Sequence, residues 1–215
     1  MIKEKKLTQE EVWDEIAPLW NKYKINGFGT KDSILEEFIS KDDKKVLDLG
    51  CGSGRNFISL KEAGFNGELY GVDFSQEMLK YAEENAKKFN IGFTGEKSKV
   101  GKLSFKDNFF DKVICIATLH CVELSEERKS AISEMYRVLK PKGKLLITVW
   151  NKNTKRWKNK PKEKHVSWKV EEGKVWRYYY LYDQEELIED LEKTGFKILK
   201  ANNPIARNIV LIAEK

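Results

Sequence analysis

Cysteine and histidine are scarce in this sequence, which has three cysteines and two histidines among its 215 residues. The cysteines, Cys51, Cys115 and Cys121, form no CxxC pair and do not have the spacing of metal ligands. A structural zinc site in this chain is therefore not expected. Cys115 lies in an apolar run, where a thiol most simply packs in the core.

Long apolar runs are also lacking, because none approaches the ~20 residues that a helix needs to span a bilayer. Residues 1–6 do not have the apolar core of a signal peptide. We therefore expect no membrane association and a cytoplasmic location.

The sequence does have ample apolar material: 40% of its residues are hydrophobic, with six Trp, eight Tyr and eleven Phe. This composition and a length of 215 residues predict a single domain with a sizeable core. Within 1–215 we expect four parts, which are a helical cover over 1–40, a core over 41–150, a basic and aromatic insert over 151–180, and a closing helix and hairpin over 181–215.

Positive charge is concentrated in one segment. Residues 152–174 contain nine Lys or Arg residues and three Glu residues, and so account for the whole net charge of +6. A local positive field of this kind favours a polyanionic partner, nucleic acid first of all. A solvated lysine-rich loop would have the same composition, and charge alone does not separate the two interpretations.

The chain alternates between helix-like and strand-like segments. Thr8 and Glu11 form a capping-box pattern that starts a first helix, which we expect to weaken near Pro18. Further helices are expected over 53–63, 76–89, 130–139 and 184–195, and strands over 46–49, 68–72, 112–116, 144–149, 196–201 and 208–213.

Strands separated by helices predict a parallel, doubly wound sheet. The last two strands are joined by only the six residues 202–207, too few for a crossover helix, so they should be antiparallel. The expected fold is α/β and Rossmann-like, a mostly parallel seven-stranded sheet with a C-terminal antiparallel hairpin and helices on both faces. This arrangement resembles that of the class I methyltransferases.

A glycine-rich loop follows the first of these strands. Gly50, Gly52 and Gly54 would let backbone amides approach a ligand closely at the point where the strand order of the sheet reverses. A dinucleotide-binding enzyme shares much of this pattern, but the third glycine of G-x-G-x-x-G would fall at position 55, which is Arg55. The dinucleotide interpretation is therefore disfavoured.

Two acidic residues indicate what the loop binds. Asp48 would repel a phosphate but attract an amino group or a sulfonium. Asp73, at the end of the second strand, suits a bidentate hold on ribose hydroxyls, and Phe74 beside it would border an adenine. S-adenosyl-L-methionine has these cationic groups and no phosphate, so the combination predicts a site for this cofactor.

Five short motifs are scattered from the first helix to the C-terminus. They are Val12-Trp13-Asp14-Glu15-Ile16-Ala17-Pro18, Ile116-Ala117-Thr118-Leu119-His120, Ile147-Thr148-Val149-Trp150, Arg177-Tyr178-Tyr179-Tyr180-Leu181-Tyr182 and Ala206-Arg207-Asn208-Ile209. Together with the glycine loop, they resemble the tRNA wobble-uridine carboxymethyl methyltransferases, a branch of the class I methyltransferases. The general cofactor motifs cover roughly residues 44–150, and the branch motifs extend over most of the chain.

This resemblance implies methyl transfer from S-adenosyl-L-methionine to the carboxylate of 5-carboxymethyluridine at position 34 of tRNA, which gives the methyl ester. It also implies a heterodimer with a small zinc-binding activator protein that covers apolar surface on the methyltransferase domain. The expected cofactor-binding residues are Asp48, Gly50, Gly52, Gly54, Arg55, Asp73, Phe74, Val100 and Ala117. Trp13 and Tyr23 are candidates for covering the cofactor.

The sequence departs from the family pattern at two places. The acidic residue that commonly contacts the adenine aligns with Lys99, with Glu96 offset by three positions, while Val100 still offers a backbone amide. The doublet usually read as His-His is His120-Cys121 here.

Five residues are candidates for the acceptor side of the site: Arg177, His120, Trp150, Arg207 and Asn208. A carboxylate acceptor is already ionised at neutral pH, so it needs alignment with the methyl group more than it needs a general base. The fork of Arg177 matches a carboxylate or a phosphate, while His120 and Trp150 end central strands where they would reach a base. Each also has a structural interpretation: a surface ion pair for Arg177, a buried hydrogen-bonded imidazole for His120, and core packing for Trp150.

Three functions stay open on these grounds. A tRNA wobble-uridine methyltransferase is the leading one. A small-molecule O- or C-methyltransferase would share the same cofactor half. An RNA-binding module without catalysis would keep the fold, although RNA binding alone would not require Asp48, the glycines and Asp73.

Overall fold

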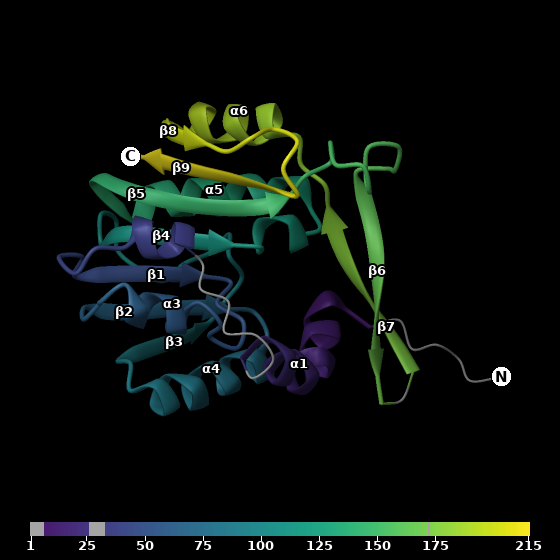
Figure 1. Cartoon of the computed structure of the whole chain (residues 1–215), viewed down its shortest axis with the longest axis horizontal. Helices are drawn as coiled ribbons and strands as arrows, with labels where there is room; N and C mark the ends of the chain where they lie inside the picture. The colour runs from purple at the N-terminus through teal and green to yellow at the C-terminus, as the bar shows by residue number, and fades with distance from the viewer. Residues whose placement is uncertain (1–6, 26–32, 172) are drawn as a thin grey trace.

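The computed structural model describes residues 7–25, 33–171 and 173–215, and its main feature is a seven-stranded sheet (Figure 1). The strand order is β3-β2-β1-β4-β5-β9-β8. The strands are β1 Lys45–Leu49, β2 Glu68–Asp73, β3 Phe93–Lys97, β4 Phe110–Ile116, β5 Leu139–Trp150, β8 Lys197–Ala201 and β9 Asn208–Glu214. Strands β1 to β5 pair in parallel, whereas β9 is antiparallel to both β5 and β8, which confirms the predicted C-terminal hairpin.

Helices cover both faces of this sheet, as predicted. One face carries α2 Ser33–Phe38, α3 Phe57–Glu62 and α4 Gln76–Phe89, and the other carries α5 Ser125–Val138 and α6 Gln184–Thr194. Alternation along β1 explains the two layers, because Leu47 and Leu49 join the core beneath α5 and α6 while Val46 joins the core beneath α2 to α4. The Rossmann-like fold class is therefore confirmed.

The first helix, α1 Gln9–Ile25, starts as predicted but does not weaken at Pro18. Thr8 Oγ1 accepts a hydrogen bond from the Glu11 backbone N–H at 3.3 Å, and the Glu11 carboxylate accepts one from the Thr8 N–H at 2.8 Å. Pro18 removes one backbone hydrogen bond of the helix. Burial of an apolar face offsets that loss, and this face consists of Val12, Trp13, Ile16 and Ala17.

Other elements differ from the predicted ones, among them β5, which begins at Leu139 rather than at 144. Helix α3 begins at Phe57 rather than at 53, because residues 51–56 are occupied by the turns of the glycine loop. Helix α5 begins at Ser125 rather than at 130, and the carboxylates of Glu126 and Glu127 in its first turn favour a helix N-terminus. Strand β3 was not predicted as an element, because it is a sheet edge whose side chains are exposed or half-buried.

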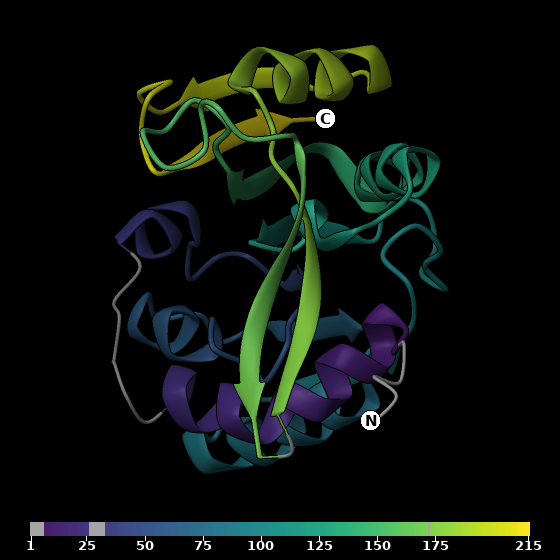
Figure 2. The same ribbon diagram turned by 90° about the vertical axis from the view of Figure 1, so that its right-hand side faces the viewer.

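Residues 151–180 contain a long antiparallel hairpin that forms a sheet of its own, made of β6 Glu163–Val170 and β7 Gly173–Tyr180. In Figure 1 the hairpin lies beyond the carboxyl ends of β1, β4 and β5, and Figure 2 shows it crossing α1. Val12 and Trp13 of α1 share an apolar cluster with Val170 and Val175 of the hairpin. Helix α1 and the hairpin thus form a wall across the carboxyl edge of the sheet.

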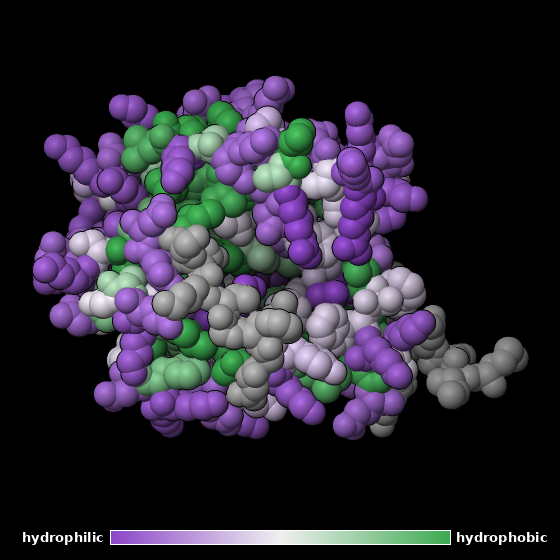
Figure 3. Space-filling view, in the orientation of Figure 1, coloured by the Kyte–Doolittle hydropathy of each residue, from purple (hydrophilic) through white to green (hydrophobic). Residues whose placement is uncertain are grey.

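The surface seen in Figure 3 is largely hydrophilic, including the upper right of the view, where the chain leads from β5 into β6. Lys155, Lys158 and Lys160 are exposed in this connection. No helix within the described ranges has both the length and the apolarity to cross a membrane.

Candidate functional site

A cavity of about 1150 Å³ opens at the carboxyl edge of the sheet. Its walls come from the glycine loop and the strand ends, from α1, and from the β6–β7 hairpin. All five predicted acceptor-side residues line it, as do seven of the nine predicted cofactor residues. The two exceptions are Asp48 and Gly54, which lie behind the wall.

The glycine loop shapes one end of this cavity through left-handed backbone. Gly50 has φ +76°, and a Cβ there would lie 2.1 Å from Thr118 Cγ2, so no larger residue fits. Gly52 has φ +52°, and its missing Cβ would point into open space with only Trp20 Nε1 nearby, at 3.9 Å. The loop therefore leaves room for a ligand directly above Gly52.

Asp73 ends β2 beside this loop. Its Oδ2 accepts a hydrogen bond from the Gly52 N–H at 2.9 Å, and its Oδ1 accepts one from the Ser75 N–H at 3.0 Å. Ser75 in turn caps α4 by accepting from the Met78 N–H, so the start of that helix fixes the carboxylate. Burial raises the pKa of Asp73 to about 6. A carboxylate held in this way keeps lone pairs for a vicinal diol such as that of ribose.

Asp48 lies one layer behind the loop and is fully buried. The side-chain amide of Asn56, which does line the cavity, donates to both carboxylate oxygens of Asp48 at 3.1 and 3.2 Å. Burial raises the pKa of Asp48 to about 7, because a desolvated carboxylate disfavours its charge. Asp48 is therefore placed to influence the cavity through its field and through Asn56, and its carboxylate has no direct contact with the cavity.

Three polar groups of the cavity wall are buried and without hydrogen-bond partners among the residues that the structure describes: Trp13 Nε1, Ser53 Oγ and Arg177 Nε. Buried polar groups in folded proteins are nearly always paired, so such groups indicate a polar ligand. Trp13 Nε1 and Ser53 Oγ, together with the free space above Gly52 and the carboxylate of Asp73, fit a nucleoside that carries an amino-acid tail. S-adenosyl-L-methionine is such a molecule.

At the end of β3, next to the region expected to hold the adenine, the acidic residue is Glu96. Glu96 accepts a hydrogen bond from Ser104 Oγ at 2.5 Å and does not line the cavity. Lys99 and Val100 do line it, and Lys99 pairs with Glu127 of α5 at 2.8 Å. The departure from the family pattern at Lys99 is thus present in the structure, with Glu127 as the acidic side chain nearest to it.

Arg177 lies on β7 at the opposite wall, and its side chain is buried although it carries a charge. Aromatic rings surround its guanidinium carbon, with the ring centroids of Trp168, Tyr179 and Trp13 at 4.7, 5.3 and 5.7 Å. No acidic side chain of the described ranges forms an ion pair with it. A desolvated guanidinium of this kind attracts an anionic ligand, since the rings stabilise its charge only partly.

His120 lies in the short helix η1 Leu119–Cys121 after β4, and it is buried. Its Nδ1 accepts a hydrogen bond from the Trp150 backbone N–H at 3.1 Å, so the proton of the neutral ring is on Nε2. Burial, and then the charge of Arg177, lower the pKa of His120 to about 3. His120 is therefore a neutral donor at physiological pH and does not serve as a general base.

Trp150 is already stacked within the protein. Its ring lies 4.1 Å from that of Tyr179 at an interplanar angle of 12°, and 5.8 Å from that of Trp157 at 19°. The ring of Tyr179 thus covers one face of Trp150, so that face is not free to stack on a base. Arg207 and Asn208 lie next to it at the start of β9 and are both exposed at the cavity mouth.

Several cavity residues were not predicted, although their positions have partial sequence signals. Trp20 continues the aromatic face of α1 one turn after Ile16, and Asn56 follows the glycine loop. Gln9 had no signal beyond its position after the capping residue Thr8. Trp13, a candidate cover for the cofactor, lines the cavity, whereas Tyr23 is exposed and packs edge-on against Trp168 instead.

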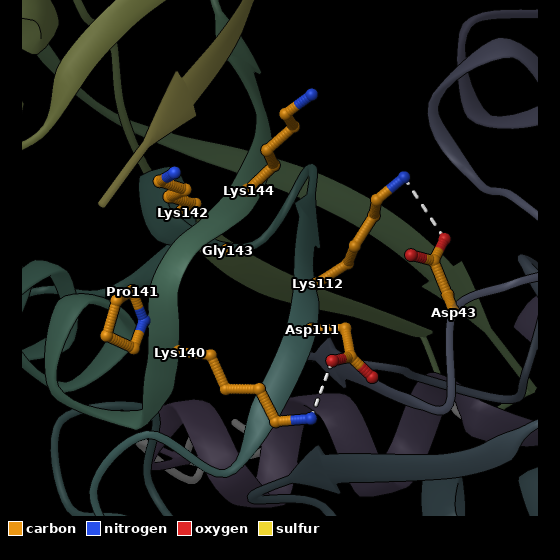
Figure 4. Close-up of a pocket in the computed structure, with 8 residues that line it drawn as sticks. All are labelled: Asp43, Asp111, Lys112, Lys140, Pro141, Lys142, Gly143 and Lys144. Carbon is orange, nitrogen blue, oxygen red and sulfur yellow. Dashed lines mark hydrogen bonds and ion pairs between the residues drawn. The ribbon is translucent and has the colours of Figure 1, made fainter.

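A second, smaller cavity of about 330 Å³ lies near the amino ends of β4 and β5, at the edge of the sheet opposite to the glycine loop (Figure 4). Lys112 pairs there with Asp43 at 3.1 Å, and Lys140 pairs with Asp111 at 2.6 Å. These ion pairs join neighbouring chain segments, and the site described above is remote from them.

The sheet order, the antiparallel β9, the glycine loop after β1 and the aspartate at the end of β2 together define the class I methyltransferase fold. The model of the methyltransferase domain family matches residues 40–196, so the chain belongs to this family. It is an S-adenosylmethionine-dependent methyltransferase.

The chain is similar to known proteins over most or part of its length. An uncharacterised protein of Methanocaldococcus jannaschii is 31% identical in an alignment 213 positions long that covers 90% of this chain and 78% of that protein. The tRNA (carboxymethyluridine(34)-5-O)-methyltransferase of Arabidopsis thaliana is 31% identical over 139 residues, which are 65% of this chain but only 31% of that protein. A crystal structure of an S-adenosylmethionine-dependent methyltransferase from Methanosarcina mazei is 25% identical, with a TM-score of 0.69 over 85% of this chain and 96% of that one.

Proposed function

We propose that this enzyme transfers a methyl group to the carboxylate of 5-carboxymethyluridine at the wobble position of tRNA and forms its methyl ester. The observation that carries the proposal is Arg177, a buried guanidinium in the cavity wall with no acidic partner in the described part of the chain. A bidentate hold on a carboxylate would complete its hydrogen bonding and neutralise its charge. The Arabidopsis relative, whose name states this acceptor, supports the same choice.

The protonation states in the cavity agree with an acceptor that is already ionised. S-adenosyl-L-methionine would supply the methyl group and leave as S-adenosylhomocysteine, and an acceptor carboxylate with a pKa near 4 would form the ester without first losing a proton. His120 is neutral with its Nδ1 engaged, and burial raises the pKa of the Cys121 thiol and of the Tyr179 hydroxyl. The chain therefore needs to align the acceptor and to exclude water, and the Nε2–H of His120 is available to donate to the acceptor.

The approach to the cavity favours a polyanion. Arg156 and Arg207 line the mouth, and Lys155, Lys158 and Lys160 are exposed beside them on the connection between β5 and β6. Phosphates of an anticodon loop would be attracted to these side chains. We include in the proposal a small zinc-binding activator protein as partner, on the strength of the motif resemblance.

Labelled S-adenosyl-L-methionine and bulk tRNA, with and without the activator, test this function. The expected product is label in tRNA as a base-labile ester of a modified uridine. Label in a lipid or metabolite extract, with none in tRNA, would overturn the proposal in favour of a small-molecule acceptor.

Substitution of the guanidinium tests the role of Arg177. Arg177→Lys keeps the charge but loses the fork, so the acceptor KM should rise by about tenfold or more, while S-adenosylhomocysteine binding stays unchanged. If binding of S-adenosylhomocysteine weakens instead and the acceptor KM does not change, then Arg177 holds the carboxylate of the cofactor.

A further inference from the structure

The side chain of Gln9, the first residue of α1, reaches across to strand β7. Its Nε2 donates a hydrogen bond to the carbonyl oxygen of Trp176 at 3.1 Å, and its Oε1 accepts one from the backbone N–H of Tyr178 at 2.8 Å. These two backbone groups belong to the residues on either side of Arg177. The amide of Gln9 therefore pairs with the edge of β7 as a neighbouring strand would.

Strand β7 depends on such a contact. It pairs with β6 along one edge only, with Arg177 opposite Val166, and the two strands form a sheet of their own. A lone two-stranded hairpin is marginal in water, and the backbone groups along its outer edge need partners when they are buried. Gln9 supplies both partners at the one place where β7 carries a buried charge.

Gln9 is itself held in place. The capping box between Thr8 and Glu11 fixes the turn of backbone from which it projects. The buried face of α1, with Val12 and Trp13, packs on Val175 of the same strand. The two hydrogen bonds therefore link two elements, α1 and β7, that also pack against each other.

The groups that surround Arg177 are carried in part by β7 itself. The ring faces of Trp168, Tyr179 and Trp13 stabilise the guanidinium, and the hydroxyl of Tyr179, on the same strand, also interacts with it. The β7 backbone, held on either side of Arg177 by the Gln9 amide, therefore sets where both side chains lie relative to the cavity.

We propose that Gln9 is a positioning residue for acceptor binding, because its side-chain amide holds the β7 backbone on both sides of Arg177 and so aims the guanidinium at the acceptor. This inference deepens the proposed function and rests on the role given there to Arg177. Gln9 acts through Arg177 and not through a contact of its own with the acceptor.

A substitution that keeps the length of the side chain but removes its hydrogen bonds tests this. Gln9→Met should raise the acceptor KM by about tenfold, the result of losing two hydrogen bonds, and should leave kcat and S-adenosylhomocysteine affinity within about twofold. Gln184→Met is the matched control, because Gln184 is the first residue of α6 and its Nε2 likewise bonds a backbone oxygen, that of Asn202, at 2.9 Å. The control should change none of the three quantities: acceptor KM, kcat or S-adenosylhomocysteine affinity.

A double-mutant cycle separates positioning from direct contact. In the Arg177→Lys background, Gln9→Met should add less than about twofold to the acceptor KM, since coupled residues lose their effects together. Additive losses, or a loss confined to S-adenosylhomocysteine affinity, would overturn the proposal.

Amide hydrogen exchange decides the same question without any acceptor. In Gln9→Met, the Tyr178 amide and the peptide around it should exchange at least about tenfold faster, while peptides from β1 and β4 keep their protection. Unchanged exchange at Tyr178 would overturn the proposal even in a fully active enzyme. If the unmodified enzyme methylates no tRNA, the proposed function fails, and the exchange result still decides whether Gln9 holds β7.

Discussion

The Nδ1 atom of His120 accepts a hydrogen bond from the backbone N–H of Trp150 at 3.1 Å, which joins the ends of two adjacent strands inside the cavity wall. This bond fixes the tautomer of the imidazole and, with burial, keeps the ring neutral. The same bond has a consequence for stability against acid. It also leaves catalysis without a titrating imidazole in the physiological range.

Acidification should destabilise the protein through His120. Its folded pKa of about 3 lies below the ordinary value of 6.5, so below pH 6.5 the unfolded chain binds a proton that the folded chain does not. At pH 5 this difference costs about 2 kcal/mol of unfolding free energy. We expect His120→Gln to lose less stability than the parent between pH 7 and pH 5 in urea unfolding. His165→Gln, at an exposed position on β6, should behave like the parent.

Replacement of Asp48 should raise the stability of the protein and weaken cofactor binding. Its pKa is raised to about 7, so the ionised carboxylate costs folding free energy that is absent below pH 4 and complete above pH 7. Asp48→Asn should therefore raise the stability of the cofactor-free protein at pH 8 by ~1–3 kcal/mol. The same change should weaken S-adenosylhomocysteine binding by about tenfold, because the cavity loses a negative charge near the bound amino group.

Calorimetric titration with S-adenosylhomocysteine at several pH values checks the predicted effect of Asp48 on cofactor binding. Affinity of the parent should fall as the pH decreases through 7 and 6, where Asp48 and Asp73 take up protons. Asp48→Asn should keep only the lower of the two steps. An Asp48→Asn variant with full affinity at every pH would contradict a role for this charge.

A methyl group at Gly52 should block the cofactor. Gly52→Ala places a Cβ in the open space below Trp20, and its φ of +52° adds backbone strain of ~1 kcal/mol. Gly64→Ala is the matched control, since Gly64 has φ +76° with nothing within 4 Å of the added Cβ. Both variants should lose similar stability in thermal unfolding, and only Gly52→Ala should lose cofactor affinity, by about tenfold or more.

Neutralisation of the basic connection should weaken RNA binding in a salt-dependent way. Changing Lys155, Lys158 and Lys160 to Gln should reduce the slope of log K against log salt by about 2, since each phosphate contact with a single strand contributes about 0.7. The control changes three exposed lysines elsewhere to Gln, namely Lys41, Lys87 and Lys142. Equal slopes for the two triple variants would mean that residues 155–160 form a solvated loop that does not contact RNA phosphates.

The mostly parallel sheet with its antiparallel C-terminal hairpin could be predicted because hydrophobic strands, capping residues and a six-residue connection are local signals. The failures have local causes too. Strand β3 is an edge with little apolar pattern, and the burial of one face of α1 overrides the proline at position 18. Glu126 and Glu127 were a usable signal for the true start of α5.

The cofactor half of the site was predictable because its residues lie in one short loop and at the next strand end. The acceptor half depends on contacts between remote segments. Nothing in the sequence around Trp150 indicates that Tyr179 takes one face of its ring, and nothing around Gln9 indicates that its amide meets β7. Arg177 could be named as a candidate, but its aromatic surroundings and its missing acidic partner could be seen only in the fold.

The contact between Gln9 and Tyr178 spans 169 positions of the chain. During synthesis the ribosome adds about 5–20 residues per second, so the first helix waits many seconds before its partner strand exists. Over that interval the glycine loop and β2 already have most of their neighbours, whereas the apolar face of α1 has none from the hairpin. A nascent chain would therefore complete the glycine-loop side of the cavity before the wall that carries Arg177, and until then the apolar face of α1 has only the residues around the start of α4, such as Met78, to pack against.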